Sequence, residues 1–233
     1  MSVRLRIILV GLLPIIVLLG LSTYEIGIEV DHYNRLNQLR PMVELVKKAS
    51  DLAHQLRPAT DEAYVTFKDY VATYDWSAIN QRLGNDINKI LTAMTALQSH
   101  RDKVTGLEIG VGENVGYYTP IVHGIIHLAS DISDLAEDPE ISKSLVAYHA
   151  LMYAIEHAGL ERARAAGLFN VQNTVSTNFV LYLGEVFRQD VYINEFYEYA
   201  TAVEIDYFEN IVQGPDVDQT LAWRKVLMQR PSA

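Results

Sequence analysis

The chain has 233 residues, of which 49% are hydrophobic and 21% charged, and its formal net charge is −10. This composition excludes a disordered or collagen-like chain, and the absence of any Lys/Arg run argues against a nucleic-acid-binding protein. The sequence contains no cysteine, which excludes disulfides, zinc–thiolate sites, cysteine nucleophiles and iron–sulfur clusters.

An uncharged apolar segment spans residues 7–24. It is at the short end of the length that a bilayer core of about 30 Å needs. Arg4 and Arg6 precede the segment and acidic residues follow it, so the positive-inside tendency predicts that residues 1–6 are cytoplasmic and residues 30–233 extracytoplasmic. A cleaved signal peptide is the alternative, but residues 20–22 match a cleavage site poorly. We therefore favour a single-pass anchor in the cytoplasmic membrane, with the main domain in the periplasm.

Strand signals are nearly absent from residues 30–233, and apolar residues recur there at helical spacing. Asp138-Pro139-Glu140 carries the residue types that begin a helix. The sequence therefore predicts an all-α antiparallel bundle after the single transmembrane helix. The expected helices are 33–74, 77–105, 118–135, 139–170, 174–213 and a short one after 214–216, with 106–116 as a loop.

Three arginines, Arg57, Arg101 and Arg162, stand at positions where the helical pattern calls for an apolar residue. A buried guanidinium cannot lose its proton, and leaving it unpaired costs several kcal/mol or more, so each needs water, a carboxylate or an anionic ligand. Arg162 lies between the small residues Gly159 and Ala166, which leaves room for a small ligand, whereas Glu161 points roughly 100° away. Snorkelling or pairing with an internal acid is the alternative.

Two segments resemble a known family. Residues 148–169 (YHALMYAIEHAGLERARAAGLF) look like the fourth-helix signature of the nitrate- and nitrite-sensing (NIT) domains of bacterial membrane receptors. Residues 52–60 (LAHQLRPAT) are similar to the first-helix motif of that family, and the resemblance covers about residues 43–228. It implies an all-helical extracytoplasmic sensor without enzymatic activity or cofactor.

The same resemblance implies the ligand and the residues that bind it. Arg162 matches the arginine of the fourth-helix motif, Arg57 and Thr60 match the first-helix motif, and Arg224 is a weaker match to a late arginine. These residues would bind nitrate or nitrite through arginines on facing helices. The chemistry is suitable because a guanidinium donates two parallel N–H bonds to a planar oxyanion. Leu56 and Pro58 replace a glutamate and a glycine of the motif, so the shape of this half of the pocket could differ.

Other arrangements are weaker. His123 and His127 are four residues apart on one predicted helix, but no third metal ligand is evident, and we expect no metal site. A tethered structural or interaction domain with internally paired arginines is the main alternative function, and a bundle-type metal enzyme is a third. A homodimer would suit a signal relay through the anchor, although no sequence feature shows one.

Overall fold

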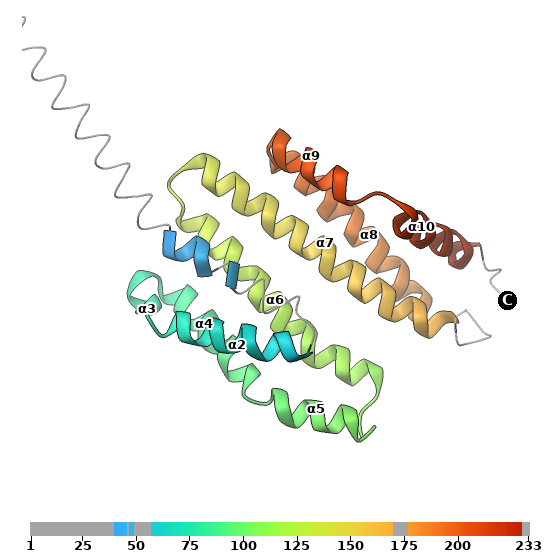
Figure 1. The fold of residues 1–233 in the computed structure, drawn as a ribbon, viewed down its shortest axis with the longest axis horizontal. Coiled ribbons are helices and arrows are strands. Elements are labelled where there is room, and N and C mark those ends of the chain that lie inside the picture. The colour runs from blue at the N-terminus through green and yellow to red at the C-terminus, as the bar shows by residue number, and fades with distance from the viewer. Residues whose placement is uncertain (1–39, 46, 49–56, 170–176, 230–233) are drawn as a thin grey trace, which may run out of the picture. The chain divides into compact units, whose positions relative to one another are not determined.

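The computed structural model describes residues 40–45, 47–48, 57–169 and 177–229. Every regular element in these ranges is an α-helix (Figure 1), which confirms the all-α prediction. The predicted anchor at 7–24 and most of the predicted helix before Arg57 lie outside the described residues. None of the described helices combines the length and the apolar character that a bilayer crossing requires. Residues from Leu45 onward form one unit, to which the following description applies.

The helix predicted over 77–105 is in fact three helices, α3 (Trp76–Ile79), α4 (Gln81–Met94) and α5 (Leu97–Thr105), preceded by α2 (Arg57–Val71). Asn80 is extended, and its side chain accepts a hydrogen bond from the backbone N–H of Leu83, so it begins α4. This prediction was wrong because apolar spacing continues across both breaks, while the Asn80 cap interrupts the helical backbone at the first of them.

Helix α6 (Val111–Leu135) begins seven residues before the predicted Tyr118, within the segment predicted to be a loop. Gly112 and Gly116 suggested a loop, but both lie in the first turns of the helix. Glycine in a helix costs only about 1 kcal/mol relative to alanine, so packing elsewhere along α6 is enough to keep these turns helical.

Helix α7 (Pro139–Phe169) has the predicted start. The Asp138 carboxylate accepts hydrogen bonds from the backbone N–H groups of Glu140 and Ile141, at 2.8 and 3.3 Å. Pro139 occupies the first turn, where a missing N–H costs nothing. This boundary is confirmed.

The helix predicted over 174–213 divides into α8 (Thr177–Tyr199) and α9 (Ala202–Ile211). Thr201 and Glu204 form a reciprocal capping box that begins α9. The last helix, α10 (Pro215–Met228), follows Gly214 as predicted, and Gly214 has a φ of 112° that other residues adopt only with strain. The prediction missed the break because a capping box within an apolar pattern resembles an ordinary helical turn.

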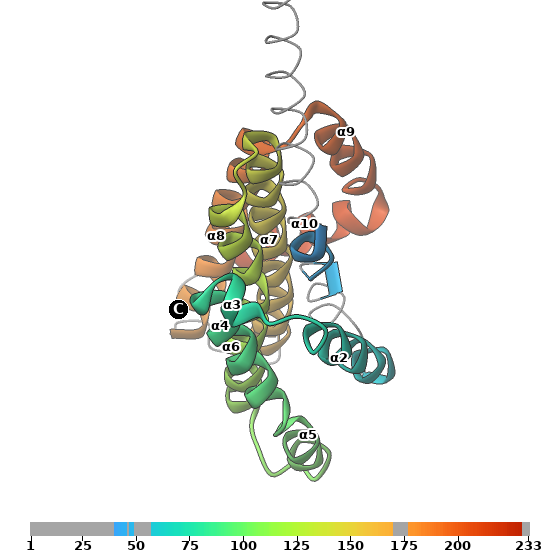
Figure 2. The ribbon, with the colours of Figure 1, turned by 90° about the vertical axis from the view of Figure 1, so that its left-hand side faces the viewer.

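Helices α6, α7 and α8 lie side by side (Figures 1 and 2), with α7 in contact with both of the others. Ala147 packs with Phe196, and Leu168 packs with Tyr182, so α7 and α8 run antiparallel. The contact of Ile126 with Met152 joins α6 to α7 in the same core. The antiparallel arrangement is therefore confirmed. It leaves α7 with two buried sides, one toward α6 and one toward α8.

Candidate functional site

The structure describes some of the sequence-predicted site residues but not all of them. Arg57 begins α2, and its side chain lies outside what the structure describes. Thr60 is half-buried, whereas Arg162 is exposed. The expectation that Arg162 occupies the buried stripe of α7 was wrong. The next-door residue Glu161 is buried instead, because α8 covers the side of α7 that lies roughly 100° away from Arg162.

Arg224 of α10 is paired with that buried glutamate. Its Nε and Nη2 donate to the two carboxylate oxygens of Glu161, at 2.9 and 2.6 Å. Gln189 and Tyr182, both from α8, also donate to the Glu161 carboxylate, at 2.7 and 3.3 Å. The hydrogen bonds and charge of Glu161 raise the pKa of Arg224 despite its partial burial. A two-pronged ion pair therefore ties α10 to α7, with α8 contributing to it.

A second buried glutamate, Glu185, lies on α8, one helical turn before Gln189. The Glu185 side chain is 3% exposed and accepts hydrogen bonds from His157 Nδ1 and Arg164 Nε, both at 2.8 Å, and from Arg188 Nη1 at 3.3 Å. Burial favours a higher pKa for Glu185, but the bonds from His157 and Arg164 outweigh it and hold the pKa below its usual value. An ionised carboxylate only accepts hydrogen bonds, so the bonded proton belongs to His157 Nδ1.

Arg101, the third arginine on an apolar stripe, pairs with an acid of the same chain, as the alternative interpretation predicted. Its Nη1 contacts the Asp61 carboxylate at 2.5 Å, and the two side chains are 8% and 60% exposed. Desolvation of Arg101 favours a lower pKa, but the hydrogen bond and charge of Asp61 raise it overall. This pair links α5 to α2.

Sequence reasoning missed Arg164, Glu185 and Arg188, and it dismissed Glu161. A usable signal was present in the spacing of polar residues. His157 and Glu161 are four apart on α7, and Glu185 and Gln189 are four apart on α8. Residues four apart lie on the same side of a helix, so each pair indicates a polar strip on its helix.

An open cleft of about 1160 Å³ lies beside the Glu185 network, between α6, α7 and α8. We call it the α6–α8 cleft. Its lining includes the side chains of His157, Arg164, Glu185 and Arg188, the aromatic rings of Tyr153 and Tyr192, and the glycines at 112 and 116. Tyr192 stacks on Tyr153 and on His157, with ring centroids 4.8 and 5.6 Å apart. The cleft therefore has an aromatic wall and a charged wall.

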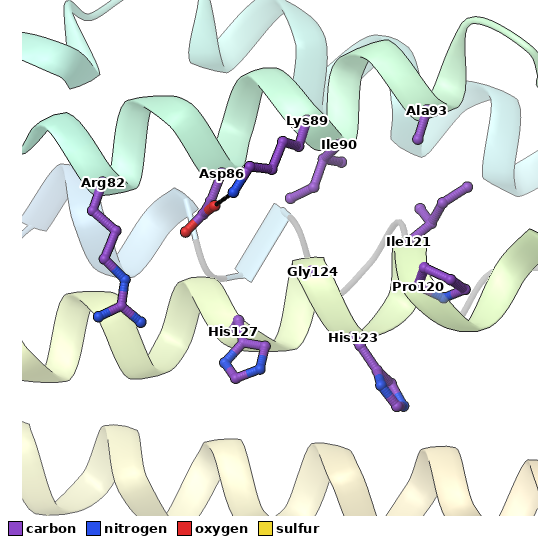
Figure 3. A pocket seen from close by; sticks show the side chains of 10 residues that line it. All are labelled: Arg82, Asp86, Lys89, Ile90, Ala93, Pro120, Ile121, His123, Gly124 and His127. Carbon is purple, nitrogen blue, oxygen red and sulfur yellow. Dashed lines mark hydrogen bonds and ion pairs between the residues drawn. The ribbon is translucent and has the colours of Figure 1, made fainter.

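A second hollow of about 460 Å³ lies between α4 and α6. Figure 3 shows that Arg82, Asp86 and Lys89 project into it from α4, with Lys89 bonded to Asp86, while His123 and His127 project from α6 toward α7. Arg82 Nη2 lies 2.9 Å from the buried carboxylate of Asp131, whose pKa is raised by burial. The cations of this hollow are thus matched by acids of the chain.

The histidines between α6 and α7 lie near aromatic rings. The His123 ring lies edge-on to Tyr153, with its centroid 5.1 Å away, and its buried Nε2 has no hydrogen-bond partner among the described residues. Burial and the neighbouring histidines lower the pKa of His123, and burial with the charge of His127 lowers the pKa of His149 to about 4. No three His, Asp or Glu side chains within the described ranges converge as a metal site.

Comparison with known proteins identifies the family. A family model described as nitrate and nitrite sensing (NIT) matches residues 42–233. The chain belongs to this family. A solved structure titled "Structure of the NasR transcription antiterminator" matches with a TM-score of 0.76 and 21% identity over 86% of this chain. The match covers 61% of the length of that protein, and at this identity it shows a shared fold. The search of curated proteins found no match.

Proposed function

We propose that this chain is the ligand-binding sensor domain of a signal-transduction receptor and that its ligand is nitrate or nitrite. The observation that carries the proposal is the match to the NIT family over residues 42–233. The abundance of guanidinium groups on α7, α8 and α10 supports it, because a guanidinium binds a planar oxyanion through two parallel donors.

The sensing domain is proposed to lie outside the cytoplasm, anchored by residues 7–24. Support comes from the sequence, where Arg4 and Arg6 precede this apolar segment and acidic residues follow it. Fusing alkaline phosphatase, which is active only after export, to the C-terminus tests the location. Phosphatase activity is expected, whereas activity of a matched cytoplasmic reporter at the same position would refute it.

Arg162 and Arg57 are proposed to contact the anion, with Thr60 as a hydroxyl donor. Arg162 is exposed, and none of the carboxylates in the described ranges pairs with it, so its donors are available to a ligand. Arg224 differs, since both of its bonds to Glu161 occupy the fork that an oxyanion would use. Arg224 therefore reaches the ligand only when Glu161 releases it.

Thermal unfolding with nitrate, chloride or sulfate at constant ionic strength tests this proposal. Nitrate at 100-fold excess over its dissociation constant should stabilise the folded chain by about 2.7 kcal/mol. Arg162→Ala and Arg57→Ala should each remove most of the stabilisation, while Lys143→Ala, which removes one exposed positive charge from the far end of α7, should retain it. An equal effect of chloride, or an unchanged effect in Arg162→Ala, would contradict the assignment.

A structural or interaction domain is the second candidate, and one observation favours it. Arg101, Arg164 and Arg224 each pair with a carboxylate of the same chain, which is the arrangement expected when arginines only hold helices together. On this interpretation no anion stabilises the fold specifically, so the same unfolding experiment separates the two functions.

Homodimerisation through the outer face of α8 is also proposed. Val180, Phe187 and Val191 are spaced by seven and four residues, and their exposed fractions are 69%, 65% and 62%. This spacing places them on one side of the helix, where a second helix could pack against them. Light scattering should report a dimer for the wild-type chain and a monomer for Phe187→Glu, and a wild-type monomer would refute the interface.

A further inference from the structure

The α6–α8 cleft carries a positive charge that the described residues lining it do not balance. Arg164 and Arg188 line the cleft, and Glu185 is the acidic residue among the described side chains that line it. Two guanidinium groups and one carboxylate leave a net charge of +1, to which His157 adds no negative charge in either protonation state. A bound monoanion would balance this charge.

In two other hollows, by contrast, cations and carboxylates are equal in number once Asp131, which pairs with Arg82 from outside the lining, is included. Between α4 and α6, Arg82 faces Asp131 and Lys89 faces Asp86. A further hollow between α5 and α6 is lined by Lys103 and Glu113, which balance each other. Of these three hollows, the α6–α8 cleft is the one in which two cations share a single carboxylate.

Both arginines of the cleft have N–H groups that are not bonded to Glu185. Within the described part of the chain, Arg164 donates to Glu185 through Nε, and Arg188 donates to it through Nη1. Each guanidinium has five N–H groups, so several on each remain for a ligand. Their side chains are 28% and 55% exposed, so an anion can reach these donors from the cleft.

Glu185 shows what kind of anion fits. Its carboxylate is planar, with two oxygens on a trigonal centre, and Arg164 and Arg188 come from different helices to meet it. Nitrate, nitrite and small carboxylates offer the same planar geometry, whereas sulfate is tetrahedral. The guanidinium groups that hold the Glu185 carboxylate are thus suited to a second anion of the same shape.

We propose that the α6–α8 cleft is a second anion site, in which Arg164 and Arg188 bind a small planar monoanion and Glu185 acts as a tethered competitor for the same two guanidinium groups. This site is separate from the one proposed around Arg162, because Arg162 and Arg164 are two residues apart and point to different sides of α7. In the ligand-free protein the Glu185 carboxylate holds both arginines. It also repels an anion that binds beside it, so it weakens the site.

If Glu185 competes with the ligand, removing its charge should strengthen nitrate binding. A purely structural Glu185 predicts no such gain. In an Arg162→Ala background, which removes the first proposed site, Glu185→Gln should tighten nitrate binding at least tenfold in calorimetric titration at constant ionic strength. The glutamine keeps the size of the side chain and removes its charge. Formate should compete with nitrate, and sulfate should compete much less. Glu198→Gln is the matched control, because it removes one exposed carboxylate from the same helix and should leave the affinity unchanged.

Arg188→Gln provides a test that does not depend on the buried glutamate. Arg188 is largely exposed, so the variant should fold, and it should abolish the gain produced by Glu185→Gln. Unchanged or weaker nitrate binding in folded Glu185→Gln, or a gain that persists in Arg188→Gln, would overturn the proposal. Loss of wild-type nitrate binding in Arg162→Ala with no gain from Glu185→Gln would overturn the cleft site alone and leave the proposed sensing function intact.

Discussion

The Arg224–Glu161 pair should hold α10 in place, and a double-mutant cycle can measure its contribution. Arg224 donates two bonds to a carboxylate whose side chain is 9% exposed, and Leu227 packs one turn further along α10 against Leu168 and Tyr182. Arg224→Gln removes the charge of the fork and leaves the buried carboxylate without its cation.

The burial of the pair sets the expected loss of unfolding free energy in Arg224→Gln. Removing one partner of a fully buried ion pair costs about 3–5 kcal/mol. Arg224 is 18% exposed, and Glu161 keeps its bonds from Gln189 and Tyr182, so we expect a smaller loss, about 2–3 kcal/mol. Glu161→Gln and the double variant complete the cycle, and the coupling energy should be about 1–2 kcal/mol.

Urea unfolding followed by circular dichroism measures these energies, and hydrogen exchange locates them. Amides of residues 215–228 should exchange faster in Arg224→Gln, because the variant loosens α10 before the rest of the bundle. Lys225→Gln removes an adjacent exposed charge and should change stability by no more than about 0.5 kcal/mol. Equal losses in Arg224→Gln and Lys225→Gln, or a coupling energy near zero, would refute the reasoning.

Three further predictions concern pH and local contacts. Burial lowers the folded-state pKa of His149 to about 4 from 6.5, so neutral His149 contributes stability that is fully present above pH 6.5. At most about 3 kcal/mol of this stability is lost as the pH falls toward 4. His149→Gln should therefore flatten the pH dependence of the unfolding free energy, and parallel curves for the variant and the wild type would contradict this. Thr201→Ala removes the capping box and should cost about 1 kcal/mol in urea unfolding, where an unchanged midpoint would show that the cap contributes nothing. Arg101→Gln should cost about 1 kcal/mol, since Asp61 is largely exposed, and should speed exchange of the α2 amides; unchanged protection of α2 would show that this pair does not hold the helix.

The sequence predicted the helices that have strong local signals at their ends. Asp138 and Pro139 begin α7, and Gly214 and Pro215 begin α10, where the sequence placed them. It missed the interruptions at Asn80 and at Thr201, because apolar spacing alone does not distinguish a continuous helix from two helices joined by a cap.

The sequence indicated the kind of ligand that the candidate site would bind, but not which arginines pair with carboxylates. Guanidinium groups among small residues on α7 indicated anion chemistry. Arg224 was predicted as a ligand-binding residue, whereas the structure pairs it with Glu161, which the sequence analysis had placed away from the site. The seven-residue spacing of Tyr148, Ile155 and Arg162 predicted that Arg162 lies on the buried side of α7. A straight helix drifts by about 20° per seven residues from such a repeat, so a register set at one end becomes unreliable near the other.

The amino-acid sequence alone determined that this chain is helical, because apolar spacing, capping residues and the lack of strand signals are local properties that need no tertiary contact. Only the tertiary structure decided which sides of α7 are buried. Helices α6 and α8 cover it from two sides, and the sequence of one helix does not show how many other helices pack against it. That choice buries Glu161 and Glu185, exposes Arg162, and determines which arginines face a carboxylate and which face open space.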